Sequence, residues 1–201
     1  MALLKTFQKM LPEAGCDEAG RGCLAGPVFA AAVILDPKKN IKGLNDSKKL
    51  SEKDRKELRL EIEEKSLAWA VSSLDNKEID KYNILKSSFM AMHRALDKLT
   101  IVPSLLLIDG NRFIPYGKIP HRCEIKGDAR FQNIAAASIL AKTYRDDYME
   151  ELHAMFPQYG WNQNKGYPTI KHRKAIKEFG PTNLHRMTFR LLNEQLELFK
   201  N

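Results

Sequence analysis

The sequence predicts an α/β fold in which buried strands alternate with helices. Two short runs, residues 28–35 and 104–108, are almost entirely apolar and match strands covered on both faces of a sheet. Residues 129–156 instead repeat apolar side chains at steps of three and four, the spacing of one helix face. A length of 201 residues suits one domain, and the basic, loop-rich end of the chain predicts a small C-terminal appendage.

The fold opens with residues 15–35, where an acidic pair precedes the first apolar strand. Asp17 and Glu18 stand among small residues, and a carboxylate beside a buried strand is costly unless a cation or hydrogen bonds compensate it. Gly20 and Gly22 flank Arg21, so the backbone can turn tightly there and approach a ligand closely. Because successive side chains of a regular strand face opposite ways, Asp17 and Glu18 can share one metal ion only if the strand ends or bulges there.

The middle of the chain predicts helices and strands in alternation. Ser51 and Asp54 form a capping-box pattern for a helix that runs to about residue 65. Alternating apolar residues predict a strand over 67–74, and residues 76–99 form one predicted helix. The run 104–108 ends at Asp109, which suits equally a turn with the following glycine or a functional carboxylate at the end of a buried strand.

The last third of the chain begins with a short predicted strand over 121–126. Asp128 immediately precedes the long helix of 129–156 and is a good N-cap candidate, which is the structural alternative to a catalytic role. From Tyr159 onward basic residues interleave with aromatic ones, and a further helix is expected after Thr169. That composition suits a nucleic-acid groove, although a charge run alone favours an ordinary solvated helix.

Composition limits the class of protein. A net charge of +8 favours polyanionic partners. Cys16, Cys23 and Cys123 lack C-x-x-C spacing, so they indicate neither a disulfide framework nor a zinc knuckle. The N-terminus lacks the apolar segment of a signal peptide, and no run reaches transmembrane length. We therefore expect a reduced, cytoplasmic, monomeric protein without a membrane partner.

Asp-Glu-Ala-Gly-Arg-Gly at 17–22 resembles the opening motif of the type 2 ribonuclease H family. Further blocks match that family in order: Asp-Ser-Lys at 46–48, Lys-Gly-Asp at 126–128, Lys-Gly-Tyr at 165–167 and His-Arg-Met-Thr-Phe at 185–189, the last with Thr in place of Ser. The resemblance implies a ribonuclease H-like fold, with a mixed five-stranded sheet flanked by helices. It also implies a catalytic core over 1–156 and a basic helical appendage over 157–201 that completes the substrate groove.

The resemblance also implies the site residues. The family's catalytic, metal-ligating carboxylates map to Asp17, Glu18, Asp109 and Asp128, and hard oxygen ligands select Mn²⁺ or Mg²⁺. Asp146 is expected to be a helix-surface or supporting residue instead. Implied substrate contacts are Gly20, Arg21, Gly22, Asn45, Ser47, Lys48, Lys165 and Tyr167, with Tyr167 against the ribose.

The implied activity is hydrolysis of the RNA strand of RNA–DNA hybrids, including cleavage 5′ of a single ribonucleotide in duplex DNA. The products would carry a 5′-phosphate and a 3′-hydroxyl, and the cellular role would be ribonucleotide excision and RNA primer removal. Selecting RNA requires sensing of a 2′-hydroxyl, for which the backbone of 20–22 and Tyr167 are candidates.

Two rival assignments are weighed against this one. Ribonuclease HIII is similar but carries an extra N-terminal domain and a different glycine block, and the first catalytic strand here is expected near residue 15. A non-catalytic RNA-binding module would explain the basic charge and Tyr167 but not four carboxylates at the ends of strands and helices.

The end of the chain suggests a protein partner. Gln195-Leu196-Glu197-Leu198-Phe199 resembles the pentapeptide with which bacterial replication and repair proteins dock on the β sliding clamp. The alternative is a final amphipathic helix in which Leu192, Leu196 and Phe199 pack on the body, and a five-residue match does not outweigh it.

Overall fold

The computed structural model describes residues 3–7, 12–45 and 47–192. Its centre is a five-stranded sheet with the strand order β3-β2-β1-β4-β5. The sheet is mixed, as expected, because β1 and β3 run antiparallel to β2 while β1, β4 and β5 are parallel. The strands are β1 (Glu13–Ala19), β2 (Val28–Leu35), β3 (Ser66–Leu74), β4 (Leu105–Asp109) and β5 (His121–Glu124).

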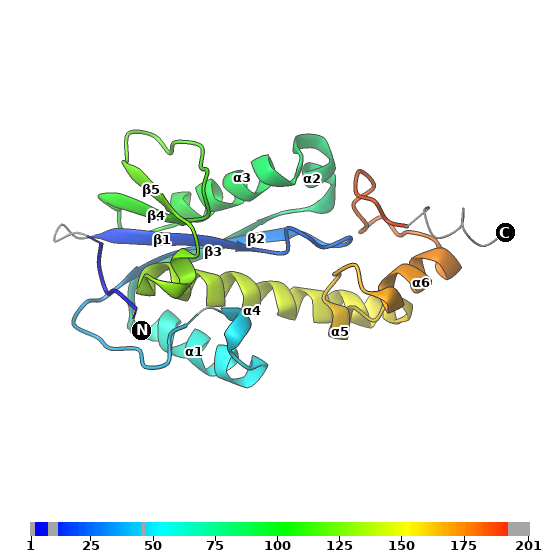
Figure 1. Ribbon diagram of the computed structural model, residues 1–201, viewed down its shortest axis with the longest axis horizontal. Coiled ribbons are helices and arrows are strands. Elements are labelled where there is room, and N and C mark those ends of the chain that lie inside the picture. The colour runs from blue at the N-terminus through cyan, green and yellow to red at the C-terminus, as the bar shows by residue number, and fades with distance from the viewer. Residues whose placement is uncertain (1–2, 8–11, 46, 193–201) are drawn as a thin grey trace.

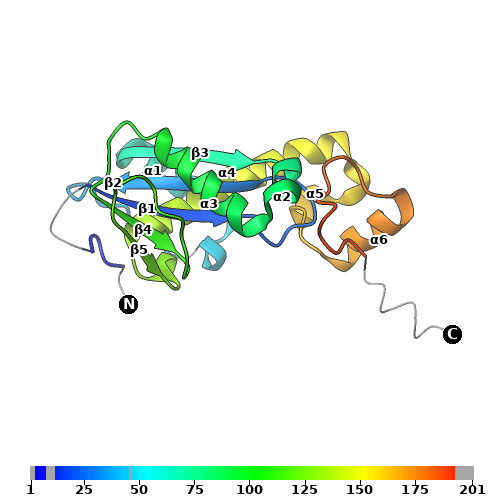
Figure 2. The same ribbon diagram turned by 90° about the horizontal axis from the view of Figure 1, so that it is seen from above.

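Helices cover both faces of the sheet (Figures 1 and 2). α3 packs on β2 and β3 from one side, and α4 packs on β1 and β2 from the other, with α1 beside it. α5 and α6 lie beyond one end of the sheet. The helices are α1 (Glu52–Lys65), α2 (Asn76–Tyr82), α3 (Ile84–Asp97), α4 (Gln132–Met155), α5 (Trp161–Asn164) and α6 (Ile170–Phe179). None of them, within the described part of the chain, combines the length and apolar character that a membrane span requires.

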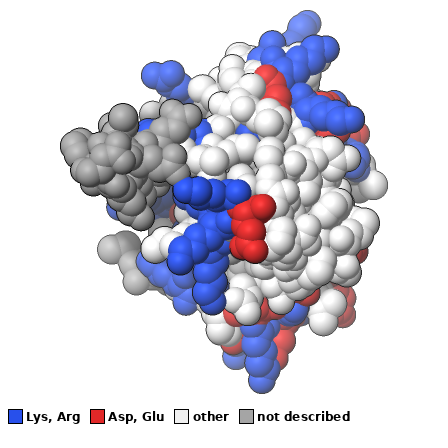
Figure 3. Space-filling view, turned by 90° about the vertical axis from the view of Figure 1, so that its right-hand side faces the viewer, with Lys and Arg blue, Asp and Glu red and all other residues white. Residues whose placement is uncertain are grey.

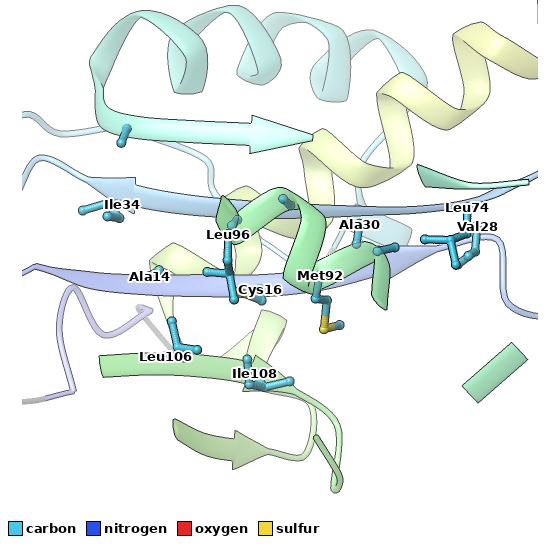
Figure 4. Packing of buried hydrophobic residues seen from close by; sticks show 14 of the residues in the cluster. Ala14, Cys16, Val28, Ala30, Ile34, Leu74, Met92, Leu96, Leu106 and Ile108 are labelled. Carbon is cyan, nitrogen blue, oxygen red and sulfur yellow. The ribbon is translucent and has the colours of Figure 1, made fainter. Parts of the chain in front are cut away.

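The apolar core has a layer on each side of the sheet. On the α3 side, Cys16 of β1 and Ile108 of β4 pack with Met92 and Leu96 (Figure 4). On the other side, Ala31 and Val33 of β2 meet α1 and the alanine-rich first half of α4. Full burial of a side chain the size of Leu, Ile or Met contributes roughly 1.5–3 kcal/mol, so these layers fix the sheet between its helices.

Close contact between α4 and β1 depends on Gly15. A Cβ atom at Gly15 would lie 2.2 Å from the backbone carbonyl carbon of Asn133, where no side chain fits. The following residues Ala135, Ala136 and Ala137 are fully buried and keep the helix near the sheet. Since Asp17 lies two residues after Gly15, this contact also sets the distance between α4 and the first acidic residue of the site.

The predicted elements are found with three differences. The helix predicted over 76–99 is two helices, because Asn83 adopts a φ of 64° and its side chain caps the start of α3. The long helix starts at Gln132, and its N-cap residue is Phe131. The interpretation of Asp128 as an N-cap is therefore wrong, and that residue lies in a separate 3₁₀ turn, Gly127–Ala129. The capping box of Ser51 and Asp54 is confirmed.

The segment that follows α4 packs against the loop between β1 and β2. Leu24 and Ala25 of that loop share an apolar cluster with Trp161 of α5 and Ile176 of α6. α6 begins directly after Thr169, as the sequence predicts, and the Thr169 side chain caps it. The start of an appendage at residue 157 stays a prediction, but the observed contacts join this segment to the loop that carries Gly20 and Gly22.

Candidate active site

Asp17 and Asp109 end neighbouring parallel strands. The last paired residues of β1 and β4 are Cys16 and Ile108, and each aspartate is the next residue of its strand. Paired residues of parallel strands point to the same face, and adjacent strands lie about 4.8 Å apart. Asp17 and Asp109 therefore lie side by side on the α4 face, at the carboxyl ends of the two strands.

Glu18 borders the same cleft as Asp17, although it alternates to the other face of β1. The cleft is lined by both carboxylates together with the start of the β1–β2 loop. The expected bulge is absent from β1, whose pairing with β2 continues without a register shift to Ala19. On its other edge, β1 stops pairing with β4 after Cys16. That edge is therefore open beside Glu18, which is the strand end that the sequence led us to expect.

Asp128 lies in the turn before α4, and that turn contacts Asp109. The amide of Gly127 donates to the Asp109 Oδ1 atom over 2.8 Å, which ties the 3₁₀ turn to the end of β4. Asp128 follows directly and is buried, with 5% of its surface exposed. The turn that carries Asp128 is thus tied to Asp109 through Gly127, with α4 beginning four residues after Asp128, and the place of the Asp128 carboxylate among the ligands stays a prediction.

The acidic group carries unfavourable electrostatics. Burial raises the pKa of Asp17 well above its ordinary value, and the charges of Glu18 and Asp109 raise it further, against a hydrogen bond from Ser138. Burial also raises the pKa of Glu18, although Arg21 donates to its Oε1 atom over 3.0 Å.

A hard divalent cation fits this set of oxygen donors, since its charge would offset both the burial and the repulsion. Within the described residues no three His, Cys, Asp or Glu side chains are already gathered at ligating positions.

The predicted substrate residues line the cleft in part. Besides the acidic pair, its walls contain Gly20, Arg21, Gly22, Ser47, Lys48 and Tyr167. Lys165 and Asn45 are not among the lining residues. Lys165 is buried, and its Nζ atom donates to the Glu150 Oε1 atom over 2.6 Å. The ammonium of Lys165 therefore serves an ion pair within the fold, and its predicted substrate contact stays a prediction.

Two lining residues, Ser138 and Lys142, were not assigned a role from the sequence. Ser138 exchanges a 2.8 Å hydrogen bond with Ser47, and Lys142 pairs with Asp146 over 2.6 Å. Of the two places expected for Asp146, the helix surface is wrong, since only 6% of the residue is exposed, and the supporting role stays a prediction. Polar residues at steps of four and three inside an otherwise apolar helix were the signal that could have identified this face.

A chain of hydrogen bonds supports the backbone of Tyr167. The amide of Thr182 donates to His185 Nδ1 over 2.9 Å, so the proton of His185 is on Nε2, which donates to His172 Nε2 over 3.3 Å. His172 Nδ1 then donates to the Tyr167 carbonyl over 2.9 Å. Trp161 Nε1 also donates to His172 Nε2, over 3.0 Å. Burial lowers the pKa of His185 to about 4, so both rings are neutral at neutral pH.

Basic side chains gather at the end of the molecule that carries α6. Lys171, Lys174 and Lys177 are exposed on that helix. Figure 3 views this end and shows Lys and Arg side chains grouped on it, some beside acidic ones. The basic segment predicted for the end of the chain thus has exposed cations. The residues of the predicted clamp peptide, Gln195, Leu196, Leu198 and Phe199, lie outside the described residues.

The chain resembles known proteins along most of its length. The family model for ribonuclease HII matches residues 14–192. A ribonuclease HII of Bacteroides thetaiotaomicron is 61% identical over 98% of both chains. The solved ribonuclease H2 of Pyrococcus horikoshii has a TM-score of 0.76 at 28% identity, covering 94% of this chain and 99% of its own.

A ribonuclease HII from Archaeoglobus fulgidus, solved in a complex with PCNA, has a TM-score of 0.74 at 27% identity and covers 94% of this chain and 100% of its own. Sequence and structure agree over nearly the whole length, and the family matched is the one whose motifs the acidic pair and the glycine block resemble. The chain therefore belongs to the ribonuclease HII family of endoribonucleases.

Proposed function

We propose that this endoribonuclease hydrolyses the RNA strand of RNA–DNA hybrids and cuts 5′ of single ribonucleotides embedded in duplex DNA. The observation that carries the proposal is the composition of one cleft. Asp17 and Glu18, a glycine-flanked turn and the partly exposed Tyr167 border the same space, although Asp109 and Asp128 are not among its lining residues. Such a cleft combines a means of hydrolysis with groups that can contact a ribose.

Asp17, Glu18, Asp109 and Asp128 would hold the metal ions, Mn²⁺ or Mg²⁺. When bound, two such ions lower the pKa of an attacking water and stabilise the leaving oxygen of a phosphodiester. Water adds to phosphorus and the bond from phosphorus to the 3′ oxygen breaks, which leaves a 5′-phosphate and a 3′-hydroxyl. The carboxylates are acceptors only, so their part is to hold charge and orientation at the scissile phosphate.

The remaining lining residues would orient the nucleic acid. Ser47 and Lys48 stand at the 3₁₀ turn Ser47–Lys49 on the cleft wall, where a phosphate could accept from the Lys48 ammonium. Tyr167 is 39% exposed, and its ring lies 6.0 Å from Lys142 Nζ and 5.9 Å from the guanidinium of Arg145. The exposed part of Tyr167 would contact the ribose, with these cations near its ring.

A substrate panel tests the activity. The protein is incubated with a DNA duplex that contains one ribonucleotide, with an all-DNA duplex and with an RNA–DNA hybrid, each with and without chelator. We expect cuts in the first and third substrates only, and none with chelator. Asp17→Asn should bind the duplex and leave it uncut. Cleavage of the all-DNA duplex, or full activity in chelator, would refute the proposal.

Tyr167 has its own test. Tyr167→Ala should lower cleavage at a lone ribonucleotide much more than it lowers duplex binding, because the ring would contact only the sugar at the cleavage point. Tyr167→Phe is the matched control and should keep most of the activity, since it retains the ring. Equal losses of cleavage and binding in Tyr167→Ala would contradict this division of roles.

Docking on a sliding clamp forms a further part of the proposal. The A. fulgidus relative was solved with PCNA, and this chain carries the Gln195–Phe199 pentapeptide near its end. A clamp contact would bring the enzyme to newly made DNA, in keeping with ribonucleotide excision and primer removal in the cytoplasm. Capture by purified β clamp should be lost on truncation after Asn193, and equal capture of both forms would remove this part.

A further inference from the structure

Two arginines are buried beneath the glycine-flanked loop that joins β1 to β2. Arg145 of α4 and Arg186 are fully buried. Arg186 donates to the carbonyls of Gly20, Arg21 and Gly26 over 2.8, 2.9 and 3.0 Å. Each of the three guanidinium nitrogens of Arg186 thus donates to a backbone carbonyl oxygen of the loop.

Arg145 holds the rest of the same loop. It donates to the carbonyls of Pro27 and Ala25 over 3.0 and 3.3 Å, and to the carbonyl of Lys165 over 2.8 Å. A Cβ atom at Gly20 would lie 2.0 Å from Arg145 Nε, so this guanidinium reaches the loop only because residue 20 is glycine. Burial of two cations is costly, and the carbonyl oxygens of the loop compensate it.

The positions of these carbonyls fix the directions of two amides. A trans peptide is planar, and its N–H points away from its C=O. The Gly20 carbonyl shares a peptide with the Arg21 amide, and the Arg21 carbonyl shares one with the Gly22 amide. Since both carbonyls point inward to Arg186, both amides point outward, and residues 20–22 line the cleft.

The geometry points to Arg186 as a positioning residue that aims the Arg21 and Gly22 amides at the sugar of the substrate. A cation behind the two peptide groups also aligns their dipoles, with the positive ends toward the cleft, which favours an oxygen acceptor there. This inference rests on the proposed function, because it assigns the recognition of a ribose hydroxyl to backbone groups that Arg186 holds in place.

Asp80 supports the arrangement from the other side. Its carboxylate accepts hydrogen bonds from the Met187 and Thr188 amides over 2.9 and 3.1 Å, and from the Thr188 hydroxyl over 2.6 Å. α2 thereby fixes the segment that carries Arg186 without touching the cleft. The threonine that replaces the family's serine at 188 supplies the hydroxyl for this contact.

The test compares binding of two duplexes that differ in one 2′-hydroxyl. Anisotropy measures the affinity for a DNA duplex with one ribonucleotide and for the all-DNA duplex, with every protein in the Asp17→Asn background so that nothing is cut. Arg186→Lys keeps the charge but cannot span three carbonyls. Arg173→Lys is the matched control, because Arg173 also donates to backbone carbonyls, those of Arg190 and Leu191, neither of which belongs to the loop.

Arg186→Lys should reduce the preference for the ribonucleotide duplex at least about tenfold, the loss expected when two hydrogen bonds to one hydroxyl are misaligned. Affinity for the all-DNA duplex should change less than about twofold, and Arg173→Lys should alter neither value. An unchanged preference in a folded Arg186→Lys protein, or equal losses for both duplexes, overturns the inference while leaving the proposed activity intact.

Two outcomes of this binding experiment are interpreted separately. If the parent protein shows no preference for the ribonucleotide duplex, the inference fails, while the substrate panel decides the proposed function separately. If Arg186→Lys does not fold, Asp80→Asn is measured instead, since it loosens the Arg186 segment from outside. A preference reduced about threefold by Asp80→Asn supports the inference, and an unchanged preference overturns it.

Discussion

Removing one buried charge from the acidic group should make the metal-free protein more stable. Asp17 lies beside Asp109 on adjacent strands, with Glu18 next in the chain. Asp17→Asn keeps the shape of the side chain and removes its charge. We expect the variant to unfold at a higher temperature than the native protein in chelator at neutral pH, because burial and neighbouring charges both oppose the carboxylate.

The size of the effect follows from the sheet geometry. Two charges about 5 Å apart repel by about 3 kcal/mol at an effective dielectric constant of about 20. The hydrogen bonds from Ser138 and from the Glu18 amide favour the charged form and offset part of this. A net gain of about 1–2 kcal/mol corresponds to a rise in Tm of about 2–8 °C for a protein of this size.

Thermal unfolding with chelator and then with Mg²⁺ measures this gain. Glu124 is the matched control, because it is equally buried but accepts from Arg122 and Arg130. Glu124→Gln should lower Tm, the opposite sign. Mg²⁺ should stabilise the native protein more than Asp17→Asn. A Tm lowered by Asp17→Asn in chelator would refute the claim that these carboxylates repel one another.

Three further results are expected. Gly20→Ala should lower the free energy of unfolding, measured in urea, by about 2–4 kcal/mol, because the new Cβ would overlap Arg145 and residue 20 has a φ of 93°. A decrease below about 0.5 kcal/mol would contradict this packing. His185 should contribute a fall of about 2–3 kcal/mol in the free energy of unfolding between pH 6.5 and pH 4, since it stays neutral in the fold while the unfolded histidine binds a proton. The raised pKa values of Asp17 and Glu18 act in the opposite direction, so the contribution is measured as the difference between the native protein and His185→Gln, and equal pH slopes would argue against it. Thr188→Val should lower Tm by about 2–4 °C through loss of the hydroxyl bond to Asp80, whereas Thr188→Ser should not.

The sequence predicts the elements of this fold because its signals are local. Apolar runs give β2 and β4, alternation gives β3, and Ser51 with Asp54 gives the start of α1. The break at Asn83 was missed because the residues on both sides have helical periodicity, and only a positive φ at one residue separates α2 from α3. The true start of α4 was missed because no side chain caps it.

Only those site residues that lie in or next to family motifs could be predicted from the sequence. Asp17, Glu18 and Asp109 were named from the family's motifs, and the register of β1 and β4 explains why Asp17 and Asp109 lie on adjacent strands. Arg145 and Arg186 act through contacts with a loop more than 100 residues away in the chain. The spacing of residues in the sequence does not indicate such long-range contacts. A buried arginine that donates to backbone carbonyls also cannot be recognised by pairing it with an acidic residue in the sequence.

The central claim is that the four carboxylates hold a pair of divalent ions against the scissile phosphate. The most direct measurement is anomalous diffraction from crystals grown with Mn²⁺ and a duplex that contains one ribonucleotide with an uncleavable linkage. The account predicts two manganese peaks at that linkage, ligated by Asp17, Glu18, Asp109 and Asp128. Peaks at other side chains, or none within ligating distance of Asp17, would contradict it.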